Sequence, residues 1–384
     1  MRQGYDIVII GAGISGAVLA QQAAAAGKKV LVLEKRNHIA GNCYDYIDEN
    51  GVLVSKYGAH LFHTNDEGVW EYVNRYASWY PWEHRVLAMV DGELVPVPVN
   101  ITTVNKLLGT NMSTEEEMKA WLGEHTVSNS NPTNGKEAAL ARVGEYLYEK
   151  MFRHYTKKQW DKYPEELDAS VLNRIPVRTN HDDRYFSDKY QALPQGGYTQ
   201  LFERLLDHPN IEVKLNTDYF DVKDKISGYE KLIYTGPIDR FFNFAYSELH
   251  PLEYRSINFV SETVEAEYFQ PNSVVNYPGK EVGFTRIIEY KHFGNQQSKR
   301  TTIVREYTTD EGEPYYPVPT EKNRQTYELY RKAAEALPDV YFVGRLANYK
   351  YFNMDQAFRN ALDVAADLFG TVEGNQISIS KRVK

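Results

Sequence analysis

The chain opens with two apolar runs on either side of an alanine-rich segment. Residues 5–10 and 29–33 are typical of buried strands, and residues 17–26 between them are typical of a helix. Two parallel strands need a crossover connection, usually a helix, so this order predicts a βαβ unit. Glu34 follows directly after the second strand.

The middle of the chain changes from strand spacing to helix spacing. Alternating apolar positions at 86–90 and 94–99 predict a hairpin that turns at Asp91-Gly92. Ser113 is the expected N-cap of the helix that follows it. The segments with helical spacing before residue 160 are 66–76, 104–108, 114–122 and 136–152. Residues 164–186 show no clear period, and a long irregular segment inside a compact protein is usually a functional loop.

Helix and strand patterns alternate again after residue 196, and a strand-rich region follows. The expected helices cover 199–206, 322–337 and 353–369. The expected strands cover 211–215, 231–234, 256–268, 282–290, 301–307 and 340–343. The strands between 256 and 307 suit an antiparallel sheet.

A glycine motif lies between the first strand and the first helix. Gly11, Gly13 and Gly16 have the spacing of a dinucleotide-binding turn, in which they permit a tight turn, a close pyrophosphate and close helix packing. Free N–H groups at a helix N-terminus bind phosphate, and Glu34 stands at the spacing of a ribose-binding acid. The motif predicts a dinucleotide site, with a purely structural βαβ unit as the alternative. FAD is favoured over NAD because the long, non-repeating sequence that follows is typical of flavoproteins.

These patterns predict an α/β fold whose parts are interleaved along the chain. The strand at 340–343, the Gly344-Arg345 turn and the last helix resemble the second flavin-contacting element of FAD folds. The Rossmann-like FAD-binding domain is expected to comprise 1–82, 191–245 and 315–384. A helical insert is expected over 100–165. The antiparallel-sheet substrate domain is expected to comprise 83–99, 166–190 and 246–314, with a mobile loop at 164–186.

Composition limits the classes of partner. The net charge of -8 over 384 residues argues against nucleic acid, whose phosphates need a basic face. No stretch approaches the ~20 apolar residues that a membrane helix needs. The first strand lies at the N-terminus, so no cleaved signal peptide is expected. A single cysteine, Cys43, allows neither an intramolecular disulfide nor a cysteine-based metal cluster, which favours a cytoplasmic location.

Aromatic and basic residues stand out in two ways. The chain has 30 tyrosines, whose flat rings and hydroxyls suit a pocket for a nucleobase and phosphates, although most must serve packing. Aromatic residues alternate with bases over 151–160, which indicates either a nucleotide-binding segment or the solvated basic face of a helix. His60 and His63 lack a third ligand nearby, so no metal site is expected.

Several segments, taken in order, resemble bacterial UDP-galactopyranose mutases over nearly the whole chain. They are Gly11-x-Gly13-x-x-Gly16, Tyr57-Gly58-x-His60-x-Phe62-His63-Thr64, Tyr155-Thr156-x-Lys158-Gln159-Trp160, Arg174-x-Pro176-Val177-Arg178, Asp183-x-Tyr185-Phe186, Thr285-Arg286-Ile287, Pro314-Tyr315-Tyr316-Pro317, and Gly344-Arg345-Leu346 with 349–355. Their joint occurrence in order makes the resemblance specific.

The resemblance implies a flavoenzyme that interconverts UDP-galactopyranose and UDP-galactofuranose without net redox change, for surface polysaccharide. It implies that N5 of reduced FAD attacks the anomeric carbon and expels UDP, so that the cofactor acts as a nucleophile. It also implies an external flavin reductant such as NAD(P)H, and a homodimer.

The resemblance also assigns roles to individual residues. Arg174 and Arg286 match two phosphate-contacting arginines, whose planar, charged guanidinium groups suit a departing diphosphate, and His63 is placed with them among the catalytic residues. From the sequence alone, a surface ion pair is the favoured interpretation of Arg286, and the family resemblance reverses it. The implied substrate-binding residues are Phe152, Tyr155, Thr156, Trp160, Tyr185, Tyr316, Tyr351, Asn353 and His84. The implied cofactor-binding residues are Gly11, Gly13, Gly16, Glu34, Asn42, His60, Arg345, Met354 and Asp355. In the family, the loop that carries Arg174 closes over bound substrate and excludes water.

Three positions depart from the family pattern. Asn353 stands where many members have Asp, yet Asn353 and Gln356 still predict a capped helix start. Ala59 and His84 lie in segments near the sugar, at positions that vary among relatives. UDP-N-acetylgalactosamine therefore stays open as a substrate. Two other classes also stay open, namely an FAD-dependent oxidoreductase of the amine-oxidase type and a non-catalytic nucleotide-sugar-binding protein.

Overall fold

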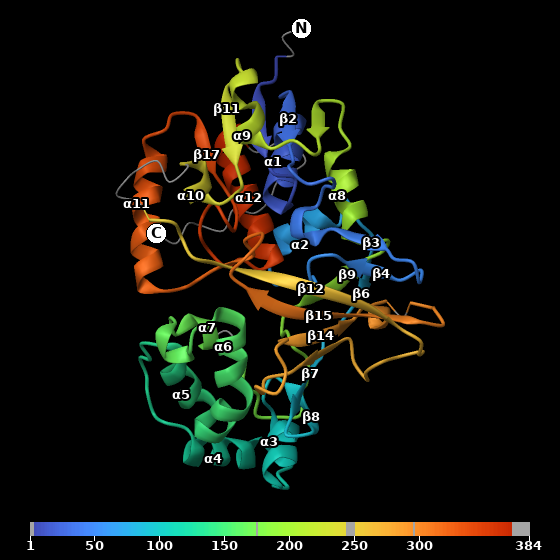
Figure 1. Ribbon diagram of the computed structural model, residues 1–384, viewed down its shortest axis with the longest axis vertical. Coiled ribbons are helices and arrows are strands. Elements are labelled where there is room, and N and C mark those ends of the chain that lie inside the picture. Colours follow the sequence, from blue (N-terminus) through green and yellow to red (C-terminus); the bar gives the residue numbers. More distant parts are fainter. Residues whose placement is uncertain (1–3, 174–175, 243–249, 295, 371–384) are drawn as a thin grey trace.

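A parallel sheet lies near the N-terminus in the computed structural model, which describes residues 4–173, 176–242, 250–294 and 296–370 (Figure 1). Its five strands have the order β10-β2-β1-β11-β17, and all neighbours are parallel. The strands are β1 (Ile7–Ile10), β2 (Val30–Leu33), β10 (Ile211–Lys214), β11 (Lys231–Tyr234) and β17 (Val340–Phe342). The apolar run of β1 is buried on both faces, as expected for a central parallel strand. Three distant parts of the chain thus build one sheet, and the predicted Rossmann-like α/β fold is confirmed.

Helices cover this sheet, and α1 packs against both α12 and α8. The helices of this region are α1 (Ile14–Ala25), α2 (Glu67–Val73), α8 (Tyr198–Leu206), α9 (Tyr219–Val222), α10 (Ile238–Phe241), α11 (Glu321–Glu335) and α12 (Met354–Phe369). The Asn353 backbone N–H donates to Gln356 Oε1 (3.0 Å), which confirms the predicted start of the last helix. No helix in the part of the chain that the structure describes is both long enough and apolar enough to cross a bilayer.

A second sheet of seven strands lies beside the first, in the order β16-β12-β15-β14-β13-β7-β8. Its strands are β7 (Val86–Val90), β8 (Glu93–Val97), β12 (Tyr254–Val264), β13 (Val274–Asn276), β14 (Arg286–Glu289), β15 (Thr301–Thr309) and β16 (Tyr316–Pro317). All its pairs are antiparallel except β13 with β7. The hairpin prediction is confirmed, because Val90 pairs with Glu93 and both Asp91 and Gly92 have positive φ, as a tight two-residue turn requires.

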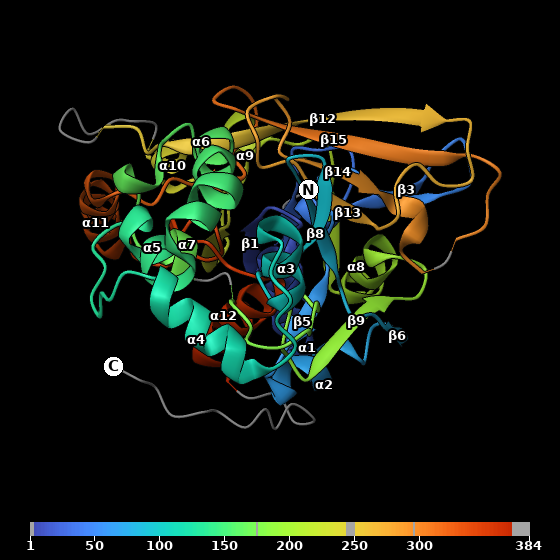
Figure 2. The same ribbon diagram turned by 90° about the horizontal axis from the view of Figure 1, so that it is seen from below.

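Helices between residues 101 and 173 form a separate group below the sheets (Figures 1 and 2). They are α3 (Ile101–Leu108), α4 (Glu115–His125), α5 (Gly135–Leu147), a π-helix (Tyr148–Arg153), α6 (His154–Trp160), a 3-10 turn (Pro164–Glu166) and α7 (Ser170–Asn173). The predicted N-cap Ser113 is wrong, since Thr114 Oγ1 accepts from the Glu117 N–H. The single helix predicted over 136–152 is also wrong. Gly144 leaves helical geometry, and a Cβ there would lie 2.2 Å from the His125 carbonyl oxygen.

Several short strands were not predicted from the sequence. They are β3 (Asp45–Ile47), β4 (Leu53–Ser55), β5 (Phe62–Thr64), β6 (Trp79–Pro81), β9 (Tyr190–Pro194) and the 3-residue β13. The strand predicted over 282–290 is shorter in the structure and covers Arg286–Glu289. The carbonyl oxygens of Val282 and Phe284 accept hydrogen bonds from the Lys158 ammonium instead of joining the sheet.

Candidate active site

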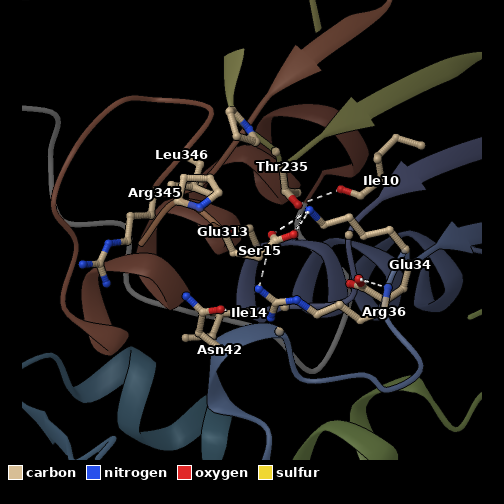
Figure 3. A pocket seen from close by; sticks show the side chains of 18 of the residues that line it. Ile10, Ile14, Ser15, Glu34, Arg36, Asn42, Thr235, Glu313, Arg345 and Leu346 are labelled. Atoms are coloured by element: carbon tan, nitrogen blue, oxygen red, sulfur yellow. Dashed lines mark hydrogen bonds and ion pairs between the residues drawn. The ribbon is translucent and has the colours of Figure 1, made fainter. Parts of the chain in front are cut away.

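A cavity of about 240 Å³ lies at the carboxyl ends of β1, β2 and β11, where nucleotides bind in open parallel sheets (Figure 3). Figure 3 shows Glu34 and Arg36 on one side of it and Arg345 on the other. The predicted cofactor residues that line it are Gly11, Gly13, Glu34, Asn42, His60, Arg345 and Met354. Gly16 lies beneath the turn, and Asp355 lines a neighbouring cavity instead.

Bare backbone forms the floor of this cavity. Gly11 has φ +101°, and a Cβ there would lie 2.3 Å from Thr235 Oγ1. A Cβ on Gly41 would lie 2.9 Å from the Gly13 Cα, so these two backbones approach as only glycines can. The exposed backbone at the start of α1 suits a pyrophosphate, which needs close N–H donors.

The Glu34 carboxylate is held in place at the end of β2. It accepts from the backbone N–H groups of Ala12 (2.9 Å) and Arg36 (2.9 Å), and it is buried. A fixed carboxylate accepts hydrogen bonds from hydroxyls such as those of a ribose. Arg36 donates to Asn42 Oδ1 (3.0 Å) and lies over the Tyr57 ring, which orders the same wall.

Arg345 has buried donors without a partner. Its guanidinium lies within 4.6 Å of the Tyr316 ring centroid and 4.4 Å of the Tyr351 ring centroid, and these two rings stack on each other. Neither Nε nor Nη2 has a hydrogen-bond acceptor among the residues described. Buried donors of this kind are nearly always satisfied in proteins. The site therefore fits an anionic group, and a dinucleotide pyrophosphate meets this requirement.

A larger cavity, of about 560 Å³, continues from the first. Residues that line both are Asn42, His60, Tyr315, Arg345, Phe352, Asn353 and Met354. The larger cavity brings together the predicted residues His63, His84, Phe152, Tyr155, Thr156, Trp160, Tyr185, Arg286, Tyr316, Tyr351, Asn353 and Asp355. They come from α6 and the π-helix before it, from β5, β14, β16 and the start of α12, and from loops near residues 84, 185 and 351. The two cavities together can hold a dinucleotide next to a second ligand.

Arg286 forms an ion pair inside this cavity rather than at the surface. Its Nε lies 2.7 Å from Glu306 Oε2, and the Glu306 side chain is only 4% exposed. Burial alone would lower the pKa of Arg286, but Glu306 and the surrounding tyrosines hold it well above its usual range. Burial raises the pKa of the Glu306 carboxyl, and Arg286 opposes that rise. The guanidinium stays charged and is aimed at the cavity by a carboxylate beneath it.

Three histidines line the two cavities with different partners. His63 Nδ1 lies 2.9 Å from Asp188 Oδ2, and its ring stacks on Phe186 at 3.6 Å. His60 Nδ1 donates to the Gly58 carbonyl (2.9 Å), and burial lowers the pKa of His60 to about 4. His84 is buried, and its Nδ1 has no hydrogen-bond partner among the described residues. Within the same residues, no group of three potential ligands could hold a metal ion.

Replacing His84 with asparagine is expected to reduce the acid sensitivity of the fold. Burial, with Arg286 and His63 nearby, lowers the pKa of His84 to about 3. The folded pKa lies below the ordinary value of about 6.5, so below that pH the unfolded chain binds a proton that the folded chain excludes. Protonation of the unfolded chain thus lowers the free energy of unfolding by about 3 kcal/mol by pH 4.5, and His84→Asn should lack this loss.

Urea unfolding at pH 7.5 and pH 4.5 measures that difference. His125→Asn, at an exposed histidine of α4, is the matched control and should keep the wild-type acid sensitivity. Equal pH dependence in wild type and His84→Asn would contradict the assignment of a buried, neutral imidazole.

Asn276 and Gln159 are among the polar cavity residues that escaped prediction. Asn276 lines the large cavity with an Oδ1 that has no partner among the described residues, and Gln159 lines it from α6. Asp355 accepts from Thr64 Oγ1 (3.0 Å) at the edge of the large cavity, burial raises its pKa, and its role at the cofactor stays a prediction. The sequence offers no spacing signal that would link Asn276 to α6.

Arg174 lies outside the described residues. The residues on either side of it border the large cavity: Val171 and Leu172 before it, and Pro176 after it. The predicted role of Arg174 thus stays a prediction.

Comparisons with known proteins agree with this geometry. A family model described as UDP-galactopyranose mutase matches residues 150–351, and one described as an NAD(P)-binding Rossmann-like domain matches residues 9–76. The chain is 38% identical to a probable UDP-galactopyranose mutase of Klebsiella pneumoniae, over 97% of this chain and 96% of that one. It is also 38% identical to a dTDP-fucopyranose mutase of Escherichia coli, over 94% and 97%. A crystal structure of reduced UDP-galactopyranose mutase superposes with a TM-score of 0.76 at 18% identity, covering 98% of this chain and 96% of that one.

Proposed function

Because the chain belongs to the UDP-galactopyranose mutase family, we propose that it interconverts UDP-galactopyranose and UDP-galactofuranose with FAD as cofactor. The observation that carries the proposal is the pair of continuous cavities, of which one has a dinucleotide cradle and the other a partly buried cation, Arg286, paired with the buried Glu306. Arg345 lines both cavities. A reaction between a bound dinucleotide and a diphosphate-bearing substrate needs this arrangement.

FAD would be held by the glycine turn at Gly11 and Gly13, by Glu34 at a ribose, and by Arg345. Reduced FAD supplies a nucleophilic nitrogen, N5, for the anomeric carbon, so the sugar can leave and rejoin UDP without net redox change. An external donor such as NAD(P)H is therefore needed to reduce the cofactor once and not at every turnover. We also propose a homodimer, on the family resemblance alone.

The protein's own contribution is to hold the diphosphate while its bond to the sugar is broken and remade. Arg286 offers a planar, permanently charged fork that can hold phosphate oxygens bidentately. Hydroxyls of Tyr185, Tyr316 and Tyr351 line the same space and can donate to the remaining oxygens. Charge that develops on the departing UDP is then met by donors that are already in position, which is worth most where water is excluded.

The nucleobase end is assigned to the opposite wall. Phe152, Tyr155 and Trp160 supply apolar and aromatic surface there, and Thr156 supplies a hydroxyl. A flat base gains about 1–3 kcal/mol from stacking on an aromatic ring. Arg174 is proposed to add a second cation from the loop next to Pro176, and closure of that loop would exclude water.

Trapping the reduced enzyme with cyanoborohydride during turnover tests this proposal most directly. UDP-galactopyranose should yield a flavin whose mass has increased by one hexosyl residue, because only a covalent link between sugar and cofactor is reducible in this way. An oxidoreductase of the amine-oxidase type would instead consume an electron acceptor stoichiometrically. A non-catalytic nucleotide-sugar-binding protein would give neither result, and unmodified flavin under turnover conditions would reject the mutase assignment.

The substrate within this reaction class has a second candidate. The dTDP-fucopyranose mutase is as similar to this chain as the UDP-galactopyranose mutase is, at 38% identity. His84, Ala59 and Asn353, which depart from the family pattern, all line the large cavity. Comparing kcat/KM for UDP-galactofuranose, dTDP-fucofuranose and the UDP-N-acetylgalactosamine furanose form assigns the substrate. UDP-galactofuranose is expected to give the highest value.

A further inference from the structure

Lys158 is partly buried under a turn of backbone carbonyl groups. Its Nζ donates to the carbonyl oxygens of Gly279 (2.8 Å), Phe284 (2.9 Å) and Val282 (3.3 Å), and also to that of Tyr277. All four acceptors belong to one turn, residues 277–284, between β13 and β14. The basic residues of 151–160 were open to interpretation as a solvated face, and for Lys158 that interpretation is wrong.

This turn and α6 form two walls of the large cavity. Asn276 just before the turn, Pro278 within it and Arg286 just after it all line the cavity. Lys158 itself comes from α6, whose neighbouring residues Thr156, Gln159 and Trp160 line the facing wall. The Lys158 ammonium therefore links α6 directly to the turn that joins β13 and β14.

The backbone of Lys158 provides a second link. Its carbonyl oxygen accepts a hydrogen bond from Thr308 Oγ1 on β15, the strand that pairs with β14. The side chain of Lys158 thus connects α6 to the 277–284 turn, and its main chain connects α6 to β15. Lys158 belongs to the sequence motif Tyr155-Thr156-x-Lys158-Gln159-Trp160, but no role was predicted for it.

Carbonyl groups that converge on one point repel each other unless a cation or donor lies between them. The turn at 277–284 therefore depends on the Lys158 ammonium for its conformation. Burial lowers the pKa of Lys158 to about 8, and the Glu281 carboxylate acts in the opposite direction. The four carbonyl dipoles also favour the charged form. The side chain is thus mainly protonated at neutral pH.

We propose that Lys158 is a positioning residue for the UDP part of the substrate, because its ammonium fixes α6 and the 277–284 turn as facing walls. The inference rests on the proposed function for the identity of the ligand, but not for the link itself. Without the ammonium, the 277–284 turn loses its fixed conformation, and Asn276 and Arg286 lose their fixed distance from α6. UDP binding must then order the turn, and the free energy of ordering lowers the affinity for UDP.

Lys158→Met in the full-length, FAD-loaded protein tests the inference with two readouts. The Kd for UDP, measured by isothermal titration calorimetry, should rise by roughly 10- to 100-fold, as expected for losing charge-assisted hydrogen bonds. Trypsin should also cut rapidly after Lys280, which is exposed within the released turn, and the fragments are identified by mass. Lys157→Met is the matched control, because Lys157 pairs with Asp161 at the surface and should leave both readouts unchanged.

Lys158→Gln is the second variant; its side chain is one atom shorter, but it keeps two N–H donors without the charge. It should give an intermediate Kd and intermediate cleavage, and it replaces Lys158→Met if that variant loses FAD. A Kd within about twofold of wild type together with wild-type resistance at Lys280 would overturn the inference. If the wild type does not bind UDP, the proposed function fails, while protection at Lys280 still decides whether Lys158 fixes the turn.

Discussion

Replacing Arg286 with alanine is expected to lower the turnover of the FAD-loaded enzyme by at least about 10³-fold. The first reason is the loss of the cation that meets the charge on departing UDP. The second is that Glu306, only 4% exposed, is left as an unpaired carboxylate beside the diphosphate. Breaking a buried pair in this way costs about 3–5 kcal/mol of stability. The chromatographic rate of UDP-galactopyranose formation and the flavin absorbance of the same sample measure turnover and cofactor content.

The pairing of Arg286 with Glu306 allows a sharper form of this experiment. Arg286→Ala combined with Glu306→Gln removes the unpaired charge, so it should regain much of the lost stability while turnover stays low. Arg300→Ala is the matched control, since Arg300 directly precedes β15, the strand that carries Glu306, but pairs with Glu265 at the surface. Its turnover should stay within twofold of wild type. Activity of Arg286→Ala within about fivefold of wild type would remove Arg286 from its proposed role. Arg174→Ala is expected to behave like Arg286→Ala, with FAD retained.

The part of the fold that could be predicted is the part that local pattern determines. The apolar runs at 7–10 and 30–33, the glycine turn and the Asp91-Gly92 hairpin carry their own signals within a few residues. The short strands β5, β6 and β9 carry none, because their sequences hold neither an apolar run nor a clear alternation of apolar and polar residues. At Gly144, where α5 is interrupted, the His125 carbonyl leaves no room for a Cβ, and that contact depends on how two helices pack.

The candidate site divides in the same way. The family resemblance pointed to residues that face the cavity, and sixteen of the predicted site residues line it. The residues that support them were missed, since each acts through a contact distant in sequence. Glu306 reaches Arg286 through the pairing of β14 with β15, and Asp188 reaches His63 across 125 residues. Such partners become visible only when strand register is known.

Replacing Gly16 with valine is expected to yield a protein without bound FAD. A Cβ at residue 16 would lie 1.9 Å from the Gly11 carbonyl oxygen, which is backbone and cannot rotate away. Gly11 is itself confined, because it has φ +101° and Thr235 Oγ1 lies where its own Cβ would be. The start of α1 must therefore move away from β1, and the N–H groups that would face the pyrophosphate move with it. Overpacking at such a site costs about 1–3 kcal/mol, which alone is a factor of roughly 5 to 150 in the Kd for FAD.

Fluorescence titration of the flavin-free protein with FAD measures this Kd, and urea unfolding shows whether the rest of the chain is intact. Gly123→Ala is the matched control, because a Cβ there meets nothing within 4 Å in α4. That variant should bind FAD like wild type and gain about 0.4–1 kcal/mol of stability from its less flexible unfolded state. If Gly16→Val instead binds FAD within twofold of wild type, the contact between α1 and the glycine turn does not position the cofactor. The cradle would then have to be assigned to Gly13 and Gly41, whose backbones approach each other independently of Gly16.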